Sequence, residues 1–318
     1  MSEPTLVDIQ NAAAILKPYI HRTPVLTSHS VDALCEARLF FKCENFQKAG
    51  AFKIRGATNA IFSLDENQAK NGVATHSSGN HAAALALAAR WRGIAATVVM
   101  PKNAAAVKIN AVHDYGAHIE FCEPTLKARE EGLVRVVQNS GAVFIPPYND
   151  FHVIAGQGTA ALELLQEVAG LDYLLAPVGG GGLLSGTAIA TSALSPSTRV
   201  IGAEPENADD AYRSFHAGKI IPATAANTIA DGLRTSLGSL TFPIIKKRVY
   251  DILLVSEEAI INAMRTIWER MKIIVEPSAA VPLGAILTYK RTFINKKVGI
   301  ILSGGNVDLD RLPWTQPG

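Results

Sequence analysis

Residues 173–194 read YLLAPVGGGGLLSGTAIATSAL, and this stretch decides the fold. The apolar run Tyr173–Val178 is short and bounded, which is typical of a buried strand in a parallel sheet. The segment Leu183–Leu194 has the length of a helix that packs on such a sheet. Four glycines separate the two: Gly179, Gly180, Gly181 and Gly182. We therefore expect a strand–turn–helix unit of a parallel α/β protein.

The four glycines also suit an anion. Only glycine lets successive backbone N–H groups converge without clashes between Cβ atoms. Those donors, together with the N-terminus of the following helix, form a cradle for a phosphate group. The spacing matches neither GxGxxG nor GxxxxGK[ST], so neither nucleotide-binding motif is indicated. The alternative is a flexible connection, although four consecutive glycines cost more conformational entropy than a mere connection requires.

A second stretch, QKAGAFKIRGA at residues 47–57, places Lys53 between apolar neighbours. Burial disfavours the ammonium form and therefore lowers the pKa of a lysine. A neutral lysine amine can form a Schiff base with a carbonyl compound. An aldehyde that also carries a phosphate is pyridoxal 5'-phosphate, so the two stretches together indicate this cofactor.

The rest of the chain alternates short apolar runs with longer amphipathic ones, as parallel α/β proteins do. Strands are predicted at Leu39–Cys43, Val73–His76, Ala96–Met100, Ile119–Cys122, Tyr173–Pro177, Val200–Ala203 and Val298–Leu302. Helices are predicted at Asn80–Trp91, Ala104–Tyr115, Lys127–Gln138, Gly156–Ala169, Leu184–Leu194 and Glu257–Lys272. Turns are predicted at Asp150–His152 and Ser195–Ser197. We expect a small domain over residues 72–143 and a discontinuous large domain over residues 1–71 and 144–318, with a cofactor cleft between them.

Composition limits the possible partners. The chain has 318 residues, of which 48% are hydrophobic and 18% charged, and its formal net charge is +2. This small net charge does not indicate binding to nucleic acid or to a membrane surface, so we expect a small-molecule substrate. No apolar segment reaches the ~18 residues of a membrane helix, and the N-terminus does not resemble a signal peptide. The widely spaced Cys35, Cys43 and Cys122 predict free thiols and a cytoplasmic location.

Three further segments place polar groups beside predicted strands. Residues 75–81, THSSGNH, open a helix with groups that suit a carboxylate, whereas an ordinary helix cap needs only one of them. Ser303 follows a strand and should face the crevice where α/β sheets bind ligands, unless it merely belongs to a glycine turn. Residues 203–210, AEPENADD, offer oxygen ligands for a divalent cation. Acids that cap a helix are the alternative there.

Together these segments resemble the fold-type II pyridoxal-phosphate enzymes, the tryptophan synthase β-like family, and within it the serine racemases and serine/threonine dehydratases. The resemblance runs from His21 to Asp308, with the motifs in the family's order. It implies a two-domain, three-layer α/β/α fold with mostly parallel sheets, and a homodimer. Ala51 stands where animal serine racemases carry serine, and Ala82–Ala83 where many relatives have bulkier or polar residues. The segment Pro146–Asp150 differs from the animal racemase loop and resembles bacterial dehydratases and fungal hydroxyaspartate dehydratases. These departures bear on the choice of substrate.

The resemblance also implies roles for individual residues. Lys53 would hold the cofactor as a Schiff base beside Phe52, Asn80 would bind the ring hydroxyl, and Ser303 would face the ring nitrogen. The phosphate would be bound by Gly179, Gly180, Gly181, Gly182 and Leu183. The substrate would be bound by Ser77, Ser78, Gly79, Asn80, His81 and Arg129. A structural Mg²⁺ (or Ca²⁺ or Mn²⁺) would be bound by Glu204, the carbonyl of Ala208 and Asp210.

For activity, the resemblance implies proton removal from Cα by Lys53 and proton delivery from the opposite face by Ser78, which is what racemisation requires. Loss of a β-hydroxyl group would instead yield a keto acid and ammonia. We expect a serine racemase with serine dehydratase activity. The alternatives are an ammonia-lyase for threonine, serine or 3-hydroxyaspartate, a cysteine-synthase-like β-replacement enzyme, and a non-catalytic binder of nucleotides or phosphorylated metabolites.

Overall fold

The larger of two sheets is built from both ends of the chain. The computed structural model describes residues 3–77, 79–104, 106–224 and 226–314. Within them this sheet has the strand order β1-β2-β10-β7-β8-β9, and only β1 runs antiparallel to its neighbour. Its strands are β1 (Val25–Leu26), β2 (Arg38–Cys43), β7 (Tyr173–Pro177), β8 (Arg199–Pro205), β9 (Asp251–Val255) and β10 (Lys297–Leu302).

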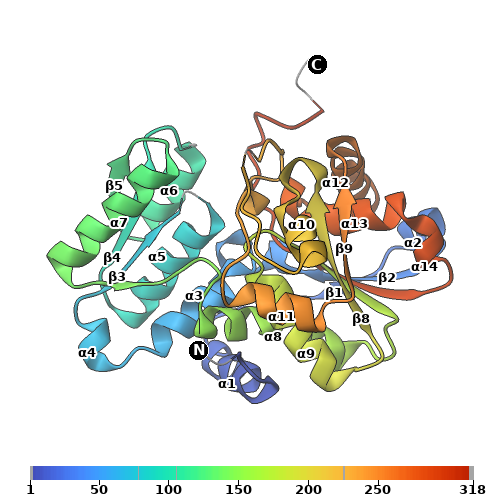
Figure 1. The fold of residues 1–318 in the computed structure, drawn as a ribbon, viewed down its shortest axis with the longest axis horizontal. Helices are drawn as coiled ribbons and strands as arrows, with labels where there is room; N and C mark the ends of the chain where they lie inside the picture. The colour runs from blue at the N-terminus through green and yellow to red at the C-terminus, as the bar shows by residue number, and fades with distance from the viewer. Residues whose placement is uncertain (1–2, 78, 105, 225, 315–318) are drawn as a thin grey trace.

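The smaller sheet comes from one continuous stretch of chain and lies beside the larger one (Figure 1). Its order is β5-β4-β3-β6, and the neighbouring strands are all parallel. The strands are β3 (Val73–His76), β4 (Ala96–Pro101), β5 (His118–Cys122) and β6 (Val143–Phe144). These bounds are consistent with a small domain at residues 72–143, although the domain limits themselves stay a prediction.

Helices cover both faces of each sheet and enclose separate apolar cores. One face of the large sheet packs on α2 (His29–Cys35), α12 (Glu257–Met271), α13 (Pro277–Thr288) and α14 (Lys290–Phe293). The core on its other face includes residues of α1 (Leu6–Leu16), α8 (Phe151–Glu167), α9 (Gly182–Leu194), α10 (Asp210–Ala217) and α11 (Thr241–Arg248). The expected three-layer α/β/α arrangement is therefore present.

The small sheet is covered in the same way. Its first face packs on α3 (Lys53–Phe62), α5 (Asn80–Arg92) and α6 (Ala106–Asp114), and its second on α7 (Leu126–Ser140). The short α4 (Glu66–Ala69) precedes β3. Because α3 belongs to this core yet also packs against α8, it joins the two lobes. None of the described helices is both long and apolar enough to cross a membrane.

The predicted strands are confirmed, and two of them, Val73–His76 and Tyr173–Pro177, match to the residue. The predicted helices are also present, with ends that shift by a few residues. The predicted turn at Asp150–His152 is wrong. The Asp150 carboxylate accepts a hydrogen bond of 2.9 Å from the Val153 N–H and caps α8, so the helix begins at Phe151. An N-cap and a turn use the same residue types, which explains the error.

Buried charges fix α3 in place. The Arg55 guanidinium donates to Glu44 at 2.7 Å and to Glu163 at 2.8 Å. Lys42 in β2 also donates to Glu163, at 2.6 Å. Glu44 belongs to η1 (Glu44–Phe46) and Glu163 to α8, so the cluster ties three elements to the first turn of α3. Two carboxylates balance two cations, which is how buried charges are tolerated.

Close backbone contact adds a second constraint on α3. A Cβ atom on Gly156 of α8 would lie 2.6 Å from the carbonyl oxygen of Arg55 and 2.7 Å from the Cα of Gly56. Both obstacles are backbone atoms of α3, which no side-chain rotation can remove. Glycine at 156 therefore sets the distance between α8 and the helix that carries Lys53.

We predict that Gly156→Ala lowers the free energy of unfolding by about 1–3 kcal/mol, because the new methyl group must separate two packed helices. Gly132→Ala in α7 is the matched control, since the atom nearest to its Cβ is a side-chain Cγ of Val99, at 2.8 Å, and not a backbone atom. Alanine is also favoured over glycine inside a helix by about 1 kcal/mol. Urea denaturation followed by circular dichroism measures both changes, and equal losses would contradict the packing argument.

Candidate active site

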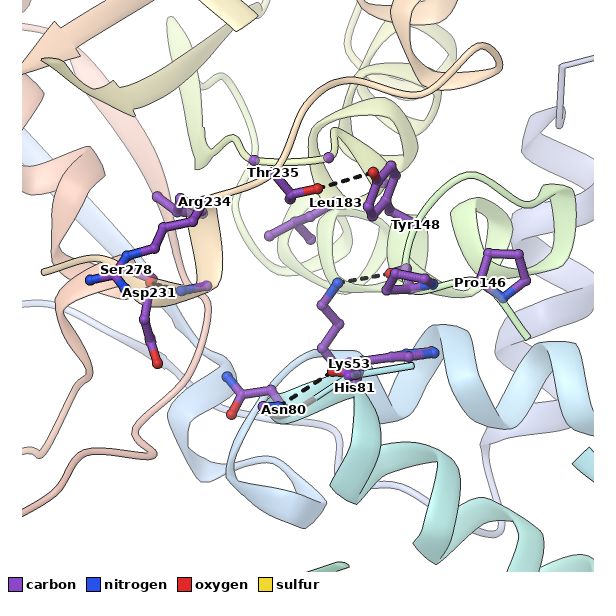
Figure 2. A pocket seen from close by; sticks show the side chains of 18 of the residues that line it. Lys53, Asn80, His81, Pro146, Tyr148, Leu183, Asp231, Arg234, Thr235 and Ser278 are labelled. Atoms are coloured by element: carbon purple, nitrogen blue, oxygen red, sulfur yellow. Dashed lines mark hydrogen bonds between the residues drawn. The ribbon is translucent and has the colours of Figure 1, made fainter. Parts of the chain in front are cut away.

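Most of the candidate site residues line a cavity of about 630 Å³ between the two lobes. The large lobe contributes the C-terminal ends of β7 and β10, and the small lobe contributes the end of β3 and the start of α5. The carboxyl ends of parallel strands are where open α/β sheets bind ligands. Figure 2 shows Lys53, Asn80 and His81 on one side of this cavity, with Leu183 and Tyr148 across from them.

Lys53 is the first residue of α3, and its side chain extends into the cavity. Its Nζ donates a 2.8 Å hydrogen bond to the carbonyl of Pro147 and lies 5.1 Å from the centre of the Phe52 ring. Burial lowers the pKa of Lys53 to about 8, and the negative charge of Glu276 partly offsets this. A larger share of the amine is therefore neutral near physiological pH than for an exposed lysine.

The glycine loop follows β7 and opens α9, as the sequence predicted. Gly181 has a φ of +88°, and no described side chain caps the helix that starts at Gly182. The Tyr148 ring lies directly over the loop, because a Cβ on Gly180 would fall 2.3 Å from it. Free N–H groups at a helix N-terminus under a loop without side chains have the geometry of a phosphate cradle.

The loop between β3 and α5 forms the opposite wall. Ser77, Gly79, Asn80 and His81 all line the cavity, whereas Ser78 lies outside the described residues. His81 is buried and interacts through Nε2 with the carbonyl of Ile145 at 3.0 Å. Burial, and secondarily the charge of Lys53, lowers the pKa of His81 to about 3. The imidazole is therefore neutral, and Nε2 must be the protonated nitrogen that donates to Ile145.

Asn80 is held by a carboxylate that the sequence did not reveal. The Asn80 Nδ2 donates to both oxygens of Glu276, at 2.9 and 3.1 Å. Burial raises the pKa of Glu276 to about 7, and the hydrogen bond from Asn80 acts in the opposite direction. Ser303 at the end of β10 is buried beside them, and its carbonyl accepts a 2.9 Å hydrogen bond from the Phe52 N–H. The lysine segment and the C-terminal motif are thus joined directly.

Charged residues of both lobes meet around the cavity. Lys108 of α6 forms an ion pair with Asp231 of η4 (Asp231–Leu233). Arg129 of α7 lines the same cavity, is half-buried, and forms no ion pair with any described residue. Burial lowers the pKa of His76, and the charge of Arg129 lowers it further, which places the guanidinium near this ring. An unpaired cation beside the cavity suits an anionic ligand.

The acidic segment lies apart from the residues that line the cavity. Glu204 is a buried residue near the end of β8, and its oxygens accept hydrogen bonds from the N–H groups of Ala211 at 2.8 Å and Tyr212 at 2.7 Å. Asp210 is also buried, and neither carboxylate oxygen has a hydrogen-bond partner of ordinary geometry among the described residues. No three His, Cys, Asp or Glu side chains of the described chain form a metal cluster. The expected site has only two carboxylates, so it stays a prediction.

Several cavity residues had no role in the sequence analysis, chiefly Glu276, Lys108, Tyr148 and Asp231. One local signal was available for Glu276, because it precedes Pro277 and caps α13. The contacts that matter, such as that between Tyr148 Oη and Thr235 Oγ1 at 3.0 Å, join distant segments (Figure 2). Sequence spacing alone does not reveal such pairs.

The described residues fit pyridoxal phosphate. The aldehyde requires an amine of lowered pKa, and Lys53 provides one. The phosphate requires converging N–H donors without side chains, and Gly179–Gly182 line the same cavity. The two features lie far apart in sequence but open onto one space, so a single ligand can engage both.

Comparisons with known proteins agree with this chemistry. The chain is 54% identical over 311 residues to a β-hydroxyaspartate dehydratase of Paracoccus denitrificans (strain Pd 1222), covering 98% of this chain and 99% of the relative. It is 51% identical over 306 residues to a serine racemase of Oryza sativa subsp. indica, covering 95% and 90%. The crystal structure of serine racemase from Dictyostelium discoideum superposes with a TM-score of 0.93 at 52% identity, covering 97% and 100%.

The match extends to the family level. The family model described as "Pyridoxal-phosphate dependent enzyme" matches residues 16–304, which contain the lysine segment, the glycine loop and Ser303. The superposition shows that the fold is that of the fold-type II enzymes, as the sequence predicted. The chain therefore belongs to the family of pyridoxal-phosphate dependent enzymes.

Proposed function

We propose that this enzyme interconverts L- and D-serine and also eliminates water from serine to give pyruvate and ammonia. The observation that carries the proposal is the amine of Lys53, with its lowered pKa, in one cavity with a phosphate cradle and the start of α5. The relatives named serine racemase and dehydratase support the same pair of activities.

The chain's own residues would hold and orient the reactants. Pyridoxal phosphate, when bound, supplies an electron sink that stabilises negative charge at the substrate's Cα. The N–H groups of Gly179–Gly182 and the side of Leu183 would hold the phosphate end. Asn80 would donate to the ring hydroxyl, Ser303 would face the ring nitrogen, and Phe52 would flank the ring. Ser77, Gly79 and His81 would surround the substrate carboxylate.

Two groups would then move protons at Cα. Lys53 Nζ removes the Cα proton from one face as a general base, and its lowered pKa keeps a neutral fraction available. The hydroxyl of Ser78 would deliver a proton from the other face, which inverts the centre, and the proton gained by Lys53 and the one lost by Ser78 would then be exchanged with solvent. In elimination, the Cα proton and the β-hydroxyl group leave together as water. Hydrolysis of the released enamine by a second water gives pyruvate and ammonia.

A second candidate is an ammonia-lyase that acts on 3-hydroxyaspartate. Arg129 is a half-buried cation beside the cavity without an ion-pair partner among the described residues, so a second substrate carboxylate could neutralise it. The relative from Paracoccus denitrificans, a β-hydroxyaspartate dehydratase, supports this choice. Elimination would then dominate over racemisation.

We predict that purified enzyme loaded with cofactor and Mg²⁺ forms D-serine and pyruvate from L-serine at comparable rates. Chiral chromatography and a keto-acid assay in one tube measure both products, with L-threonine and 3-hydroxyaspartate run alongside. Keto acid without D-serine, formed fastest from 3-hydroxyaspartate, would favour the lyase instead.

Ser78→Ala sharpens this assay, since it should reduce racemisation more than elimination from L-serine. Elimination needs no proton from the second face, whereas inversion does. Equal losses of the two activities would contradict the role given to Ser78.

Lys53→Ala should abolish the Schiff-base absorption band and reduce turnover by at least about 10²-fold, the lower end of what a general base contributes. Lys48→Ala is the matched control, because Lys48 is an exposed lysine of the same segment. Spectra and product formation are compared for both variants after dialysis against pyridoxal phosphate. Turnover retained by Lys53→Ala, or lost equally in Lys48→Ala, would contradict the role proposed for Lys53.

We also propose that Glu204, the carbonyl of Ala208 and Asp210 bind a structural Mg²⁺, with Ca²⁺ or Mn²⁺ as alternatives. Burial raises the pKa of Glu204 to about 9 and that of Asp210 to about 7. The N–H groups of Tyr212 and Ala211 act against the shift at Glu204, whereas the N–H of Asp210 itself and then the charge of Arg213 act against it at Asp210. Buried carboxylates that form no ion pair among the described residues favour a bound cation.

The raised pKa values of these two carboxyl groups make the protein less stable as pH rises. The folded pKa values lie above the ordinary values of 4.5 and 3.8, so the stability these groups contribute is complete below about pH 4. The contribution of Asp210 is lost as pH rises through about 7, and that of Glu204 is lost as pH rises through about 9. Mg²⁺ should therefore raise the melting temperature more at about pH 8 than at about pH 6, because the cation binds the charged form.

Asp210→Asn should remove this cation response, while Glu206→Gln on the exposed neighbouring residue should keep it. At a cation concentration of about 100 times Kd, the stabilisation is about 2.7 kcal/mol in the wild type. Differential scanning fluorimetry at the two pH values measures it. An Asp210→Asn variant that still responds to Mg²⁺ would rule out this site.

The remaining proposals concern assembly and location. We propose a homodimer on the basis of the family resemblance, and the exposed Phe46 and Ile274 offer apolar surface for a partner copy. The Asn45 side chain donates to the Ile274 carbonyl, so these two residues lie on neighbouring segments. We propose a cytoplasmic location because the three cysteines are free thiols, all buried.

A further inference from the structure

Asn80 stands in the middle of a chain of three polar side chains. Asn306 Nδ2 donates to the carbonyl of Ala49 at 2.8 Å and to the Oδ1 of Asn80 at 2.9 Å. Asn80 Nδ2 in turn donates to the two oxygens of Glu276, at 2.9 and 3.1 Å. Every contact joins segments that are distant in sequence, and together they connect the lysine segment, the start of α5, the start of α13 and the C-terminal motif.

These hydrogen bonds determine the orientation of the Asn80 side-chain amide. An amide has an oxygen that only accepts and a nitrogen that only donates, and rotation by 180° about χ2 exchanges them. After such a rotation, Oδ1 would face the carboxylate of Glu276 and Nδ2 would face the Nδ2 of Asn306. The contact with Asn306 would be repulsive at any pH and the contact with Glu276 whenever its carboxylate is ionised, so Asn306 and Glu276 together select one orientation. A single N–H of Nδ2 can serve both Glu276 oxygens as a three-centre bond, which leaves the second N–H for a ligand.

Asn306 is itself held firmly against the lysine segment. Gly50 has a φ of +70°, and a Cβ on it would lie only 2.3 Å from the Oδ1 of Asn306. The N–H of Gly305 donates to the carbonyl of Gly50 at 2.9 Å. Any other residue at position 50 would force Asn306 to move, so Gly50 is needed for the observed position of the Asn306 side chain.

Glu276 is held in a similar way. Its side chain is only 4% exposed, and its backbone N–H donates to the carbonyl of Gly304 at 3.0 Å. A Cβ on Gly304 would lie 2.6 Å from Glu276 Oε1, so this glycine also leaves room for its partner. Both neighbours of Asn80 are therefore positioned by backbone contacts as well as by their hydrogen bonds.

We infer that Asn306 and Glu276 are positioning residues that keep the N–H end of Asn80 toward the cofactor ring, so that the ring oxygen receives a hydrogen bond. The inference rests on the role proposed for Asn80 and not on which amino acid is the substrate. A hydrogen bond received by the oxygen stabilises its deprotonated form. Loss of that bond, or its replacement by the Asn80 oxygen, shifts the bound cofactor toward the form in which the oxygen carries the proton.

The test uses Asn306→Asp, which keeps the shape of the side chain but replaces its N–H donor by an acceptor. Asn80 can then turn its Nδ2 toward position 306 and present Oδ1 to the ring. The ratio of the two cofactor absorption bands, which report the deprotonated and protonated ring oxygen, should change by about three- to tenfold, as one ordinary hydrogen bond provides. Asn262→Asp, on the exposed side of α12, controls for the added charge.

A double-mutant cycle separates positioning from a general structural effect. Asn306→Asp is also made in an Asn80→Ala background, where the inference requires that the band ratio no longer respond. Cofactor affinity and thermal melting are measured in parallel, because a merely structural role would lower both in either background. Should Asn306→Asp bind too little cofactor, Asn306→Ala removes the donor without adding an acceptor and should shift the ratio in the same direction by less.

The outcomes are distinct. An unchanged ratio in Asn306→Asp and Asn306→Ala, or an equal shift in the Asn80→Ala background, overturns the inference. If Asn80→Ala alone leaves the ratio unchanged, Asn80 does not bind the ring oxygen and the inference falls with that role. Neither result decides between racemase and lyase, since the spectra are recorded before any substrate is added.

Discussion

Arg55 lies two residues after Lys53 and carries its charge into the interior, where Glu44 and Glu163 bind it. The side chain of Arg55 is completely buried, so neither carboxylate can be lost without leaving an unbalanced charge, which costs about 3–5 kcal/mol. This cluster fixes the rotation of α3 about its own axis. Because Lys53 begins that helix, the same ion pairs determine where the Lys53 amine points.

The cavity itself follows a different electrostatic rule. Its charges are separated so that each lysine has one acid nearby, Glu276 for Lys53 and Asp231 for Lys108. Arg129 and Arg234 also line the cavity, and neither forms an ion pair with a described residue. Arg234 donates to the carbonyl of Thr228, so Arg129 has the more available charge for a ligand. Low hydration near Lys53 and Glu276 moves their pKa values toward each other, to about 8 and about 7. Both groups can therefore exchange protons near neutral pH.

Much of this arrangement was predictable because it depends on local patterns. The strand Tyr173–Pro177 is an apolar run that ends just before the glycines, and such a signal needs no tertiary information. The helix α13 was not predicted, because it is buried on all sides and contains Pro282, so it shows neither periodicity nor a clean helical composition. Glu276 was missed for another reason, since its partner Asn80 lies 196 residues away. The family's motifs indicated the reacting groups, whereas the residues that orient them emerged only from the folded chain.

At several places a glycine leaves room for the side chain of a distant partner, among them Gly50 for Asn306, Gly304 for Glu276 and Gly180 for Tyr148. The volume missing from one position is occupied by the other, so the effect of a substitution at either depends on what stands at its partner. Such pairs are epistatic. A directed-evolution library that varies one member at a time will reach few viable sequences there, while a library that varies both members together can exchange a large side chain for a small one.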